Sequence, residues 1–126
     1  MEAEEIVRAY WAAMETNDFK KAAGFFSEGY ICRWPQSSEV IEGKENFIRI
    51  NSEYPSEGRW TFIINNLVAD AGRAVTDVSI SDGKLKARAV TFHTIVDGLI
   101  TEQLEFWPED YEAPAWRRKW VKIDKS

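Results

Sequence analysis

The chain has 126 residues, of which 44% are hydrophobic and 13% aromatic, a composition that excludes a disordered chain and is typical of one folded domain. Its 21 acidic and 16 basic residues give a net charge of −5, which argues against a nucleic-acid partner because such proteins present a basic face. One cysteine, Cys32, and one histidine, His93, exclude an internal disulfide and any site that needs two of either residue.

No window holds 18 uncharged apolar residues, so we expect no membrane span. The acidic, amphipathic start does not resemble a secretory signal, so we expect a cytoplasmic protein. The sequence also lacks the motifs of phosphate loops, dinucleotide folds, nucleophile elbows and zinc-binding helices. We therefore expect no cofactor and no metal.

The first third of the chain predicts two short helices, and a third helix follows after two strands. Apolar residues recur at helical spacing over 4–15, with acidic residues in the first turn, where the helix dipole favours them. Asn17-Asp18 breaks this pattern and can cap a second helix, which includes Phe19 and Phe26 and ends at Glu28-Gly29. Strands are expected over 30–34 and 39–42, and the third helix from Gly43 to Pro55.

Residues 59–107 are rich in β-branched and aromatic side chains and predict strands, with turns at 70–72, Asp82-Gly83 and Asp97-Gly98. A two-residue Asp-Gly turn fixes the register of a hairpin and therefore the faces of its strands. The two registers place Val78 opposite Ala87, Asp77 opposite Arg88 and His93 opposite Glu102. The predicted core face carries Val78, Ile80, Leu85, Ala87, Ala89, Thr91, His93, Ile95, Glu102, Leu104 and Phe106. The inward face of 59–69 stays open, because the loop at 70–72 does not fix one register.

The opposite face of these strands is polar at one end and apolar at the other. The apolar end consists of Val90, Phe92, Val96 and Leu99. A solvated face does not normally carry such a patch, so we expect a partner subunit or the C-terminal tail, 108–126, to cover it. Within that tail Trp116 and Trp120 lie four residues apart, and we predict that they hold the tail on the body.

Helices followed by a curled antiparallel meander predict an α+β fold with the helices on one face of the sheet. A sheet that wraps around helices forms a cone with a central pocket. We expect residues 1–126 to make this single domain, with the tail packed on the body.

Three stretches of the sequence resemble the nuclear transport factor two-like superfamily, in its SnoaL-like and ketosteroid-isomerase-like branch. They are IVRAYWAAMETNDFKKAAGFFSEGYICRWP, GKENF and DGLITEQLEFWPEDYEAPAWRRKWV. The resemblance covers nearly the whole chain and implies a cone of the cystatin-like roll type, usually in a homodimer that packs through the outer sheet face. Superfamily members isomerise, cyclise, dehydrate, open epoxides, sense ligands or carry proteins, so the fold alone does not give the activity.

The resemblance also implies roles for particular positions. Tyr10 lies where the isomerases keep the tyrosine that donates to the developing oxyanion. Trp34, just before Pro35, lies where they keep the aspartate that shuttles the proton, and a tryptophan cannot take a proton from carbon. Phe92 or His93 lies where they keep a protonated acid as a second donor. The chain is therefore similar to the ketosteroid isomerases in fold and not in mechanism.

His93 and Glu102 are the polar pair of an otherwise apolar predicted face, and a carboxylate beside a buried imidazole can bring a proton-transfer pKa near neutrality. We interpret His93 as the acid–base, Glu102 as its orienting partner, and Tyr10 as the donor to a substrate oxygen. The expected pocket walls are Trp34, Phe62, Leu104 and Phe106. The alternative is structural: the buried pair only fixes register, and Tyr10 only tethers its hydroxyl.

Two functions remain open at this point. One is a cofactor-free acid–base enzyme, of isomerase, cyclase or lyase type, acting on a small apolar carbonyl or hydroxyl compound. The other is a non-catalytic dimeric module that binds a ligand or a protein. The second predicts that Phe62 and Trp34 fill the cavity, which would leave no open space beside His93.

Overall fold

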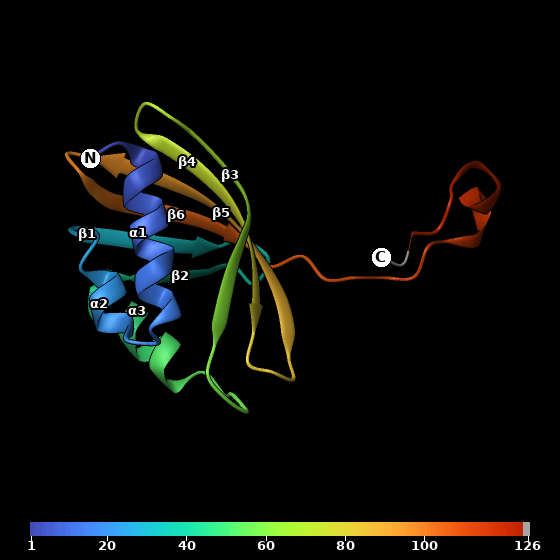
Figure 1. The fold of residues 1–126 in the computed structure, drawn as a ribbon, viewed down its shortest axis with the longest axis horizontal. Helices are drawn as coiled ribbons and strands as arrows, with labels where there is room; N and C mark the ends of the chain where they lie inside the picture. Colours follow the sequence, from blue (N-terminus) through green and yellow to red (C-terminus); the bar gives the residue numbers. More distant parts are fainter. Residues whose placement is uncertain (125–126) are drawn as a thin grey trace.

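In the computed structural model, which describes residues 1–124, three helices cover one face of a curved sheet (Figure 1). The helices are α1 (Ala3–Glu15), α2 (Phe19–Ala23) and α3 (Gly43–Glu53). The strands are β1 (Phe26–Trp34), β2 (Glu39–Glu42), β3 (Thr61–Asp70), β4 (Arg73–Ser81), β5 (Lys86–Val96) and β6 (Leu99–Phe106). A short 3₁₀ helix, η1 (Ala115–Trp120), lies in the C-terminal tail. The predicted α+β fold is confirmed.

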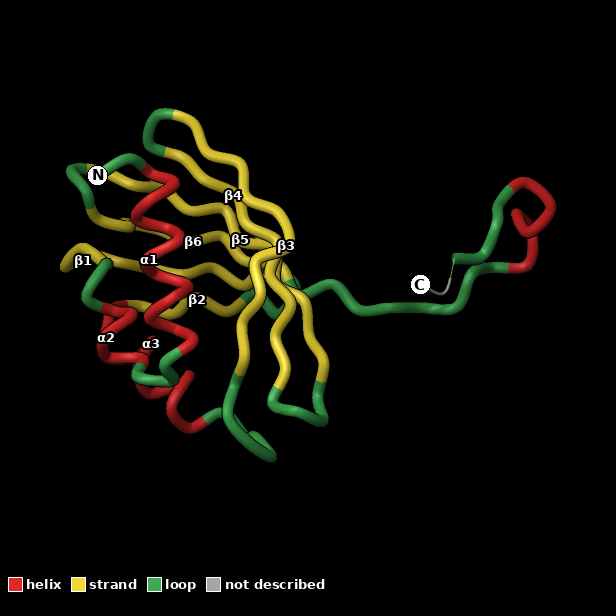
Figure 2. Tube along the Cα trace, viewed as in Figure 1, coloured by secondary structure: helices red, strands yellow, loops and turns green. Residues whose placement is uncertain are grey.

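The sheet order is β2-β1-β6-β5-β4-β3, so β2 and β3 are its two edges and the sheet does not close (Figure 2). β1 and β6 run parallel, whereas the other neighbouring strands are antiparallel, which makes the sheet mixed rather than wholly antiparallel. Within residues 1–124, no helix is long and apolar enough to cross a bilayer.

The N-terminal helices form where the capping residues predict them. α1 starts with a capping box between Glu2 and Glu5 and buries its face centred on Tyr10. Asp18 caps α2 by accepting from the backbone N–H of Lys21 at 3.2 Å. α2 is shorter than predicted, because the chain leaves the helix at Gly24 and Phe26 already begins β1. The Phe26 ring stacks on Tyr30 with centroids 3.7 Å apart, so it enters the core from a strand.

The Asp97-Gly98 turn forms as predicted, and the strand after it then departs from the predicted register. Asp97 and Gly98 both have positive φ, and Ile95 lies opposite Ile100. Thr101 is then an extra residue, a β-bulge, so Glu102 lies opposite Thr94 and not opposite His93. The predicted His93–Glu102 pair is therefore wrong by one position.

This bulge exchanges the faces of the rest of β6. Gln103 lies opposite His93 and is buried, and Glu105 lies opposite Thr91. Leu104 pairs with Phe92 on the outer face, where the rings of Phe92 and Phe106 are in contact. The prediction that Leu104 and Phe106 line the pocket is wrong, because a one-residue slip moves every following side chain to the other face.

The register between β4 and β5 also differs from the prediction, but their side chains keep the predicted faces. The turn at Asp82 has four residues, because the Asp82 carboxylate accepts from the backbone N–H groups of Lys84 and Leu85. Val78 therefore lies opposite Ala89 rather than Ala87, a shift of two that keeps the same face inward. In β3 a second bulge, at Asn65, lets Phe62, Ile64, Leu67 and Ala69 all pack against the core.

The Asp77–Arg88 ion pair does form, although the shifted register makes it diagonal. Arg88 lies opposite Ser79, and its Nη2 donates to Asp77 Oδ2 at 2.7 Å. The contact holds the pKa of Asp77 well below its usual range. The pair lies at the surface.

The C-terminal tail leaves the body after β6 and extends away from it (Figure 1). Trp116 and Trp120 are 72% and 70% exposed, so the prediction that they hold the tail on the body is wrong. Residues 125 and 126 of the predicted tail lie outside the described residues. We call residues 108–124 the arm.

Candidate active site

A mostly apolar pocket of about 280 Å³ opens between the helices and the sheet, at the end of the cone where β6 ends. We call it the mouth pocket. Its lining residues are Phe19, Trp34, Glu39, Asn51, Tyr54, Trp60, Phe62, Leu85, Ala87 and Trp107. A smaller, more enclosed space of about 40 Å³, the inner chamber, shares Trp34, Asn51, Phe62 and Trp107 with it. The two spaces therefore adjoin, and the inner one has room for a small polar group or a water.

Glu105 is the carboxylate of the inner chamber. Its side chain comes from β6 and the residue is only 7% exposed. Trp34 Nε1 donates to Glu105 Oε1 at 3.0 Å, and Thr91 Oγ1 donates to Oε2 at 2.6 Å. Burial raises the pKa of Glu105, and these two hydrogen bonds oppose that rise in part. A buried carboxyl with a raised pKa at the base of a pocket is suited to proton transfer.

Tyr10 reaches the same chamber from α1. Burial, and next the nearby Glu105 carboxylate, raise the pKa of Tyr10 well above its usual value. Its hydroxyl therefore stays protonated and can donate a hydrogen bond. Burial also raises the pKa of Cys32, which lines the chamber, so its thiol stays protonated and is a poor nucleophile.

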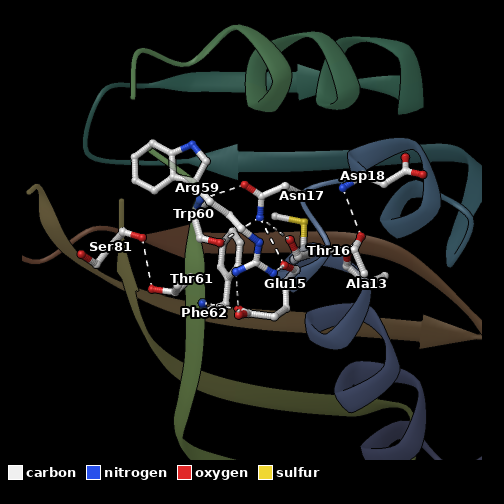
Figure 3. Close-up of polar contacts among 11 residues, drawn as sticks. Ala13, Glu15, Thr16, Asn17, Asp18, Arg59, Trp60, Thr61, Phe62 and Ser81 are labelled. Atoms are coloured by element: carbon white, nitrogen blue, oxygen red, sulfur yellow. Dashed lines mark hydrogen bonds and ion pairs between the residues drawn. The ribbon is translucent and has the colours of Figure 1, made fainter. Parts of the chain in front are cut away.

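The wall of the mouth pocket on β3 is tied to the end of α1 (Figure 3). Asn17 has a left-handed backbone with φ of 64°, and its side chain exchanges two hydrogen bonds of 2.8 Å with the backbone of Trp60. Glu15 accepts from the backbone N–H of Phe62 at 2.6 Å and pairs with Arg59. These contacts fix Trp60 and Phe62 at the opening.

His93 lies apart from both spaces, in a buried polar row. Trp11 Nε1 donates to Thr76 Oγ1 at 3.1 Å, and Thr76 Oγ1 is 2.9 Å from His93 Nε2. On the other side Gln103 Nε2 lies 3.1 Å from His93 Nδ1, and Gln103 Oε1 accepts from the Tyr30 hydroxyl. Burial lowers the pKa of His93 to about 3. The ring is therefore neutral, with both nitrogens engaged within the core.

The structure thus separates the residues that the sequence analysis grouped together. Tyr10, Trp34 and Phe62 line the inner chamber, whereas His93 is packed behind it. Glu102 lies on the outer face, where its carboxylate is 3.9 Å from Arg33.

Sequence reasoning missed Glu105 and Thr91 as a hydrogen-bonded pair. In the stretch LITEQLEF, Ile100, Leu104 and Phe106 lie at alternate positions, so the apolar side chains favoured the face that excludes Glu105.

The profile of the SnoaL-like domain family matches residues 7–103. This chain belongs to that family. A solved structure from Kribbella flavida, described as a candidate ketosteroid isomerase, superposes on this SnoaL-like domain with a TM-score of 0.88 and 31% identity. That alignment covers 97% of this chain and 89% of the other, so it extends into the arm.

Two further solved structures share the fold of this SnoaL-like domain. An NTF-2 like protein of unknown function from Burkholderia xenovorans has a TM-score of 0.80 and 26% identity, over 96% of this chain and 94% of that one. A candidate SnoaL-like polyketide cyclase from Jannaschia has a TM-score of 0.59 and 17% identity, over 70% and 71%, and supports the fold alone. The comparison with curated proteins gave no match.

Proposed function

We propose that this SnoaL-like domain binds a small, mostly apolar carbonyl or hydroxyl compound and transfers a proton on it without a cofactor. The observation that carries the proposal is Glu105, a buried carboxyl that is held by two donors and lines a chamber adjoining an open apolar pocket. The aromatic mouth pocket would hold the apolar part of the compound, and its polar end would enter the inner chamber. The family membership supports a pocket of this kind.

In this proposal Glu105 is the base and Tyr10 is the oxyanion donor. Each Glu105 oxygen accepts one hydrogen bond from the protein and keeps a lone pair for a proton. For a carbonyl compound, the C–H bond next to the carbonyl breaks, the proton goes to Glu105, and the electron pair moves to the carbonyl oxygen. The Tyr10 hydroxyl then stabilises that oxygen. Where a carbon–carbon double bond is conjugated with the enolate, return of the proton to the far carbon of that bond completes an isomerisation. Trp34, which holds Glu105 Oε1, has a positioning role.

The first prediction uses hydrogen–deuterium exchange at carbon, which reports proton abstraction whatever the natural substrate is. Small cyclic ketones, such as cyclohexanone and cyclohexenone, are incubated with the protein in D₂O, and loss of the signal next to the carbonyl is followed by NMR. We expect the domain to accelerate the exchange and Glu105→Gln to reduce that acceleration about 100-fold or more, because the amide cannot accept the proton.

The matched control is Glu102→Gln, the same change three residues earlier on the outer face of β6. It should leave the exchange rate unchanged. Exchange that survives Glu105→Gln would remove the proposed role of Glu105. Saturable binding of the ketones with no exchange would instead support the non-catalytic ligand-binding module.

The second part of the proposal is a homodimer that packs through the outer sheet face. The corrected register enlarges the apolar patch there, because Leu104 and Phe106 join Val90 and Phe92. Val96 and Leu99, beside the turn, are 51% and 40% exposed. Contiguous apolar surface of this kind favours an interface.

Replacing Phe92 by Glu tests this interface, because it puts a charge in the middle of the patch. We expect sedimentation velocity to show a dimer for the unchanged protein and a monomer for Phe92→Glu, with the same far-UV circular dichroism. An unchanged sedimentation coefficient for the variant would place the interface elsewhere.

A further inference from the structure

The tip of the arm carries two large aromatic side chains in water. Trp116 and Trp120 lie in η1 and are 72% and 70% exposed, and Val121 beside them is 47% exposed. The guanidinium of Arg117 and the ammonium of Lys119 lie 5.7 and 4.9 Å from the two ring centroids. A cation covers at most one face of an indole, so most of each ring remains available to a docking surface.

The root of the arm is fixed so that the arm points away from its own body. The backbone N–H of Trp107 donates to Gln36 Oε1 at 2.5 Å, and Gln36 Nε2 donates to the Trp107 carbonyl at 3.3 Å. Pro108 follows directly and keeps the backbone before it extended, and Pro114 does the same just before η1. Returning the tip to its own pocket would require a reversal at a root that these contacts hold.

The arm is long enough to reach another molecule. Trp116 follows Trp107 by nine positions, an extended span of roughly 30 Å, which is about the diameter of a small domain. The tip can therefore contact a second copy while the two bodies lie side by side.

Charge and shape both match the tip to the mouth pocket. Residues 115–122 hold four basic and no acidic side chains, whereas residues 1–107 hold 17 acidic and 11 basic ones. The mouth pocket is lined mainly by aromatic side chains, including Trp34, Trp60 and Phe62, and carries one carboxylate, Glu39, at an exposed position. An indole flanked by cations is complementary to an aromatic opening with a carboxylate.

We infer that the arm of one copy docks its tip over the mouth pocket of a second copy, with Trp116 in the opening and Arg117 beside Glu39. A two-fold dimer lets both arms do this at once. Each pocket is then closed by the partner, which excludes water from the inner chamber. That consequence for catalysis rests on the proposed function, whereas the docking itself is tested without any ligand.

The test uses cysteine cross-linking between two singly substituted full-length proteins. Arg117→Cys is mixed with Glu39→Cys under mild oxidation, and non-reducing electrophoresis follows the products; the native Cys32 is buried. We expect a disulfide-linked dimer of the two different chains. Arg117→Cys mixed with Glu2→Cys, at the start of α1, is the control and should give at least tenfold less of it.

A chain that carries both Arg117→Cys and Glu39→Cys distinguishes exchange from closure within one molecule. Rapid intramolecular disulfide formation at low protein concentration, with no dimer from the mixed single variants, would overturn the inference, because the arm would then cover its own pocket. Failure of both disulfides would overturn it as well. Neither result would affect the exchange reaction of Glu105, so the two proposals can fail separately.

The tip residues provide a second measurement. Replacing Trp116 and Trp120 together by Ala should raise the dimer dissociation constant at least tenfold in sedimentation equilibrium, because buried tryptophans often dominate an interface. Ile50→Ala, which removes an exposed apolar side chain on α3, should leave the constant unchanged. An unchanged constant for the double variant would show that the arm does not contribute to association.

Discussion

Burial shifts the titration of Glu105 and His93 in opposite directions, and in both cases it favours the neutral form. The pKa of Glu105 is raised, which suits a proton acceptor, whereas that of His93 falls to about 3. Gln103 presents its amide N–H to His93 Nδ1, because its oxygen already accepts from Tyr30. A charged imidazole would place a second N–H against that donor. His93 is therefore a structural residue, although it is the chain's one histidine.

This neutral histidine predicts a loss of stability in mild acid. The unfolded chain binds a proton at His93 near pH 6.5, and the folded chain does not until about pH 3. The folded pKa is the lower one, so the stabilisation is complete above pH 6.5 and declines as the pH falls. At pH 5 the loss is on the order of 2 kcal/mol. Urea unfolding at pH 7.5, 6 and 5 measures it.

His93→Gln is the comparison for this measurement. The variant keeps a polar side chain without a titrating ring, so its unfolding free energy should be flatter between pH 7.5 and 5 even if it is lower throughout. Glu105 acts in the opposite sense, since its raised pKa makes its contribution decline as the pH rises. The comparison is therefore best made in a Glu105→Gln background. Equal slopes with and without His93 would contradict the assignment of a buried neutral ring.

At the scale of one element, a single extra residue in β6 decides which side chains meet the cavity. Thr101 has no partner across the strand pair, and its hydroxyl donates to the Thr94 carbonyl at 3.3 Å. Because of it, Gln103 and Glu105 face inward and Leu104 faces outward. If Thr101 were paired with Thr94 instead, Glu102 would lie opposite His93, which is the register that the sequence predicts.

Deleting Thr101 tests this account of the bulge. Without Thr101 the strand pairs regularly, with Ile100 still opposite Ile95 and Glu102 opposite Thr94, so Gln103 and Glu105 stay inward. The deletion should therefore change the unfolding free energy by less than about 1 kcal/mol. Deleting Leu104 instead must displace Gln103 or Glu105 from its inward position, and it should lower the unfolding free energy by at least about 3 kcal/mol because polar partners are lost from the core. Deleting Asp110, in the arm beyond the sheet, should change it by less than about 0.5 kcal/mol. Thermal melts of the three deletions would show the difference, and a large loss of stability on deletion of Thr101 would contradict its assignment as the bulge residue.

Much of this fold could be predicted from the sequence, because helix caps, alternating strands and Asp-Gly turns are local signals. The bulges at Asn65 and Thr101 could not be predicted. The sequence around each is compatible with either face of the strand pointing inward, and tertiary packing selects one of the two. The candidate site depended on that choice. Tyr10 and Trp34 come from well-specified elements and reach the chamber, whereas Glu105 was assigned to the wrong face.

At the scale of the whole molecule, the tail does not pack on the body as the sequence predicts, and its tryptophans remain exposed. The sequence predicts that Trp116 and Trp120 pack on the body of their own chain, because a single sequence shows no other surface that could bury them. The fixed root at Gln36 and the extended path through two prolines direct them outward instead. Sequence patterns identify a side chain that needs burial, and they do not say in which molecule it is buried.

The parallel pairing of β1 with β6 has a consequence for biosynthesis. Trp34 and Glu105, which meet in the inner chamber, are 71 residues apart along the chain. When β5 has been synthesised, both β1 and β5 still lack β6, the strand that lies between them in the sheet. Such open edges invite aggregation. The cavity is therefore complete only once β6 has been synthesised and has paired with both β1 and β5.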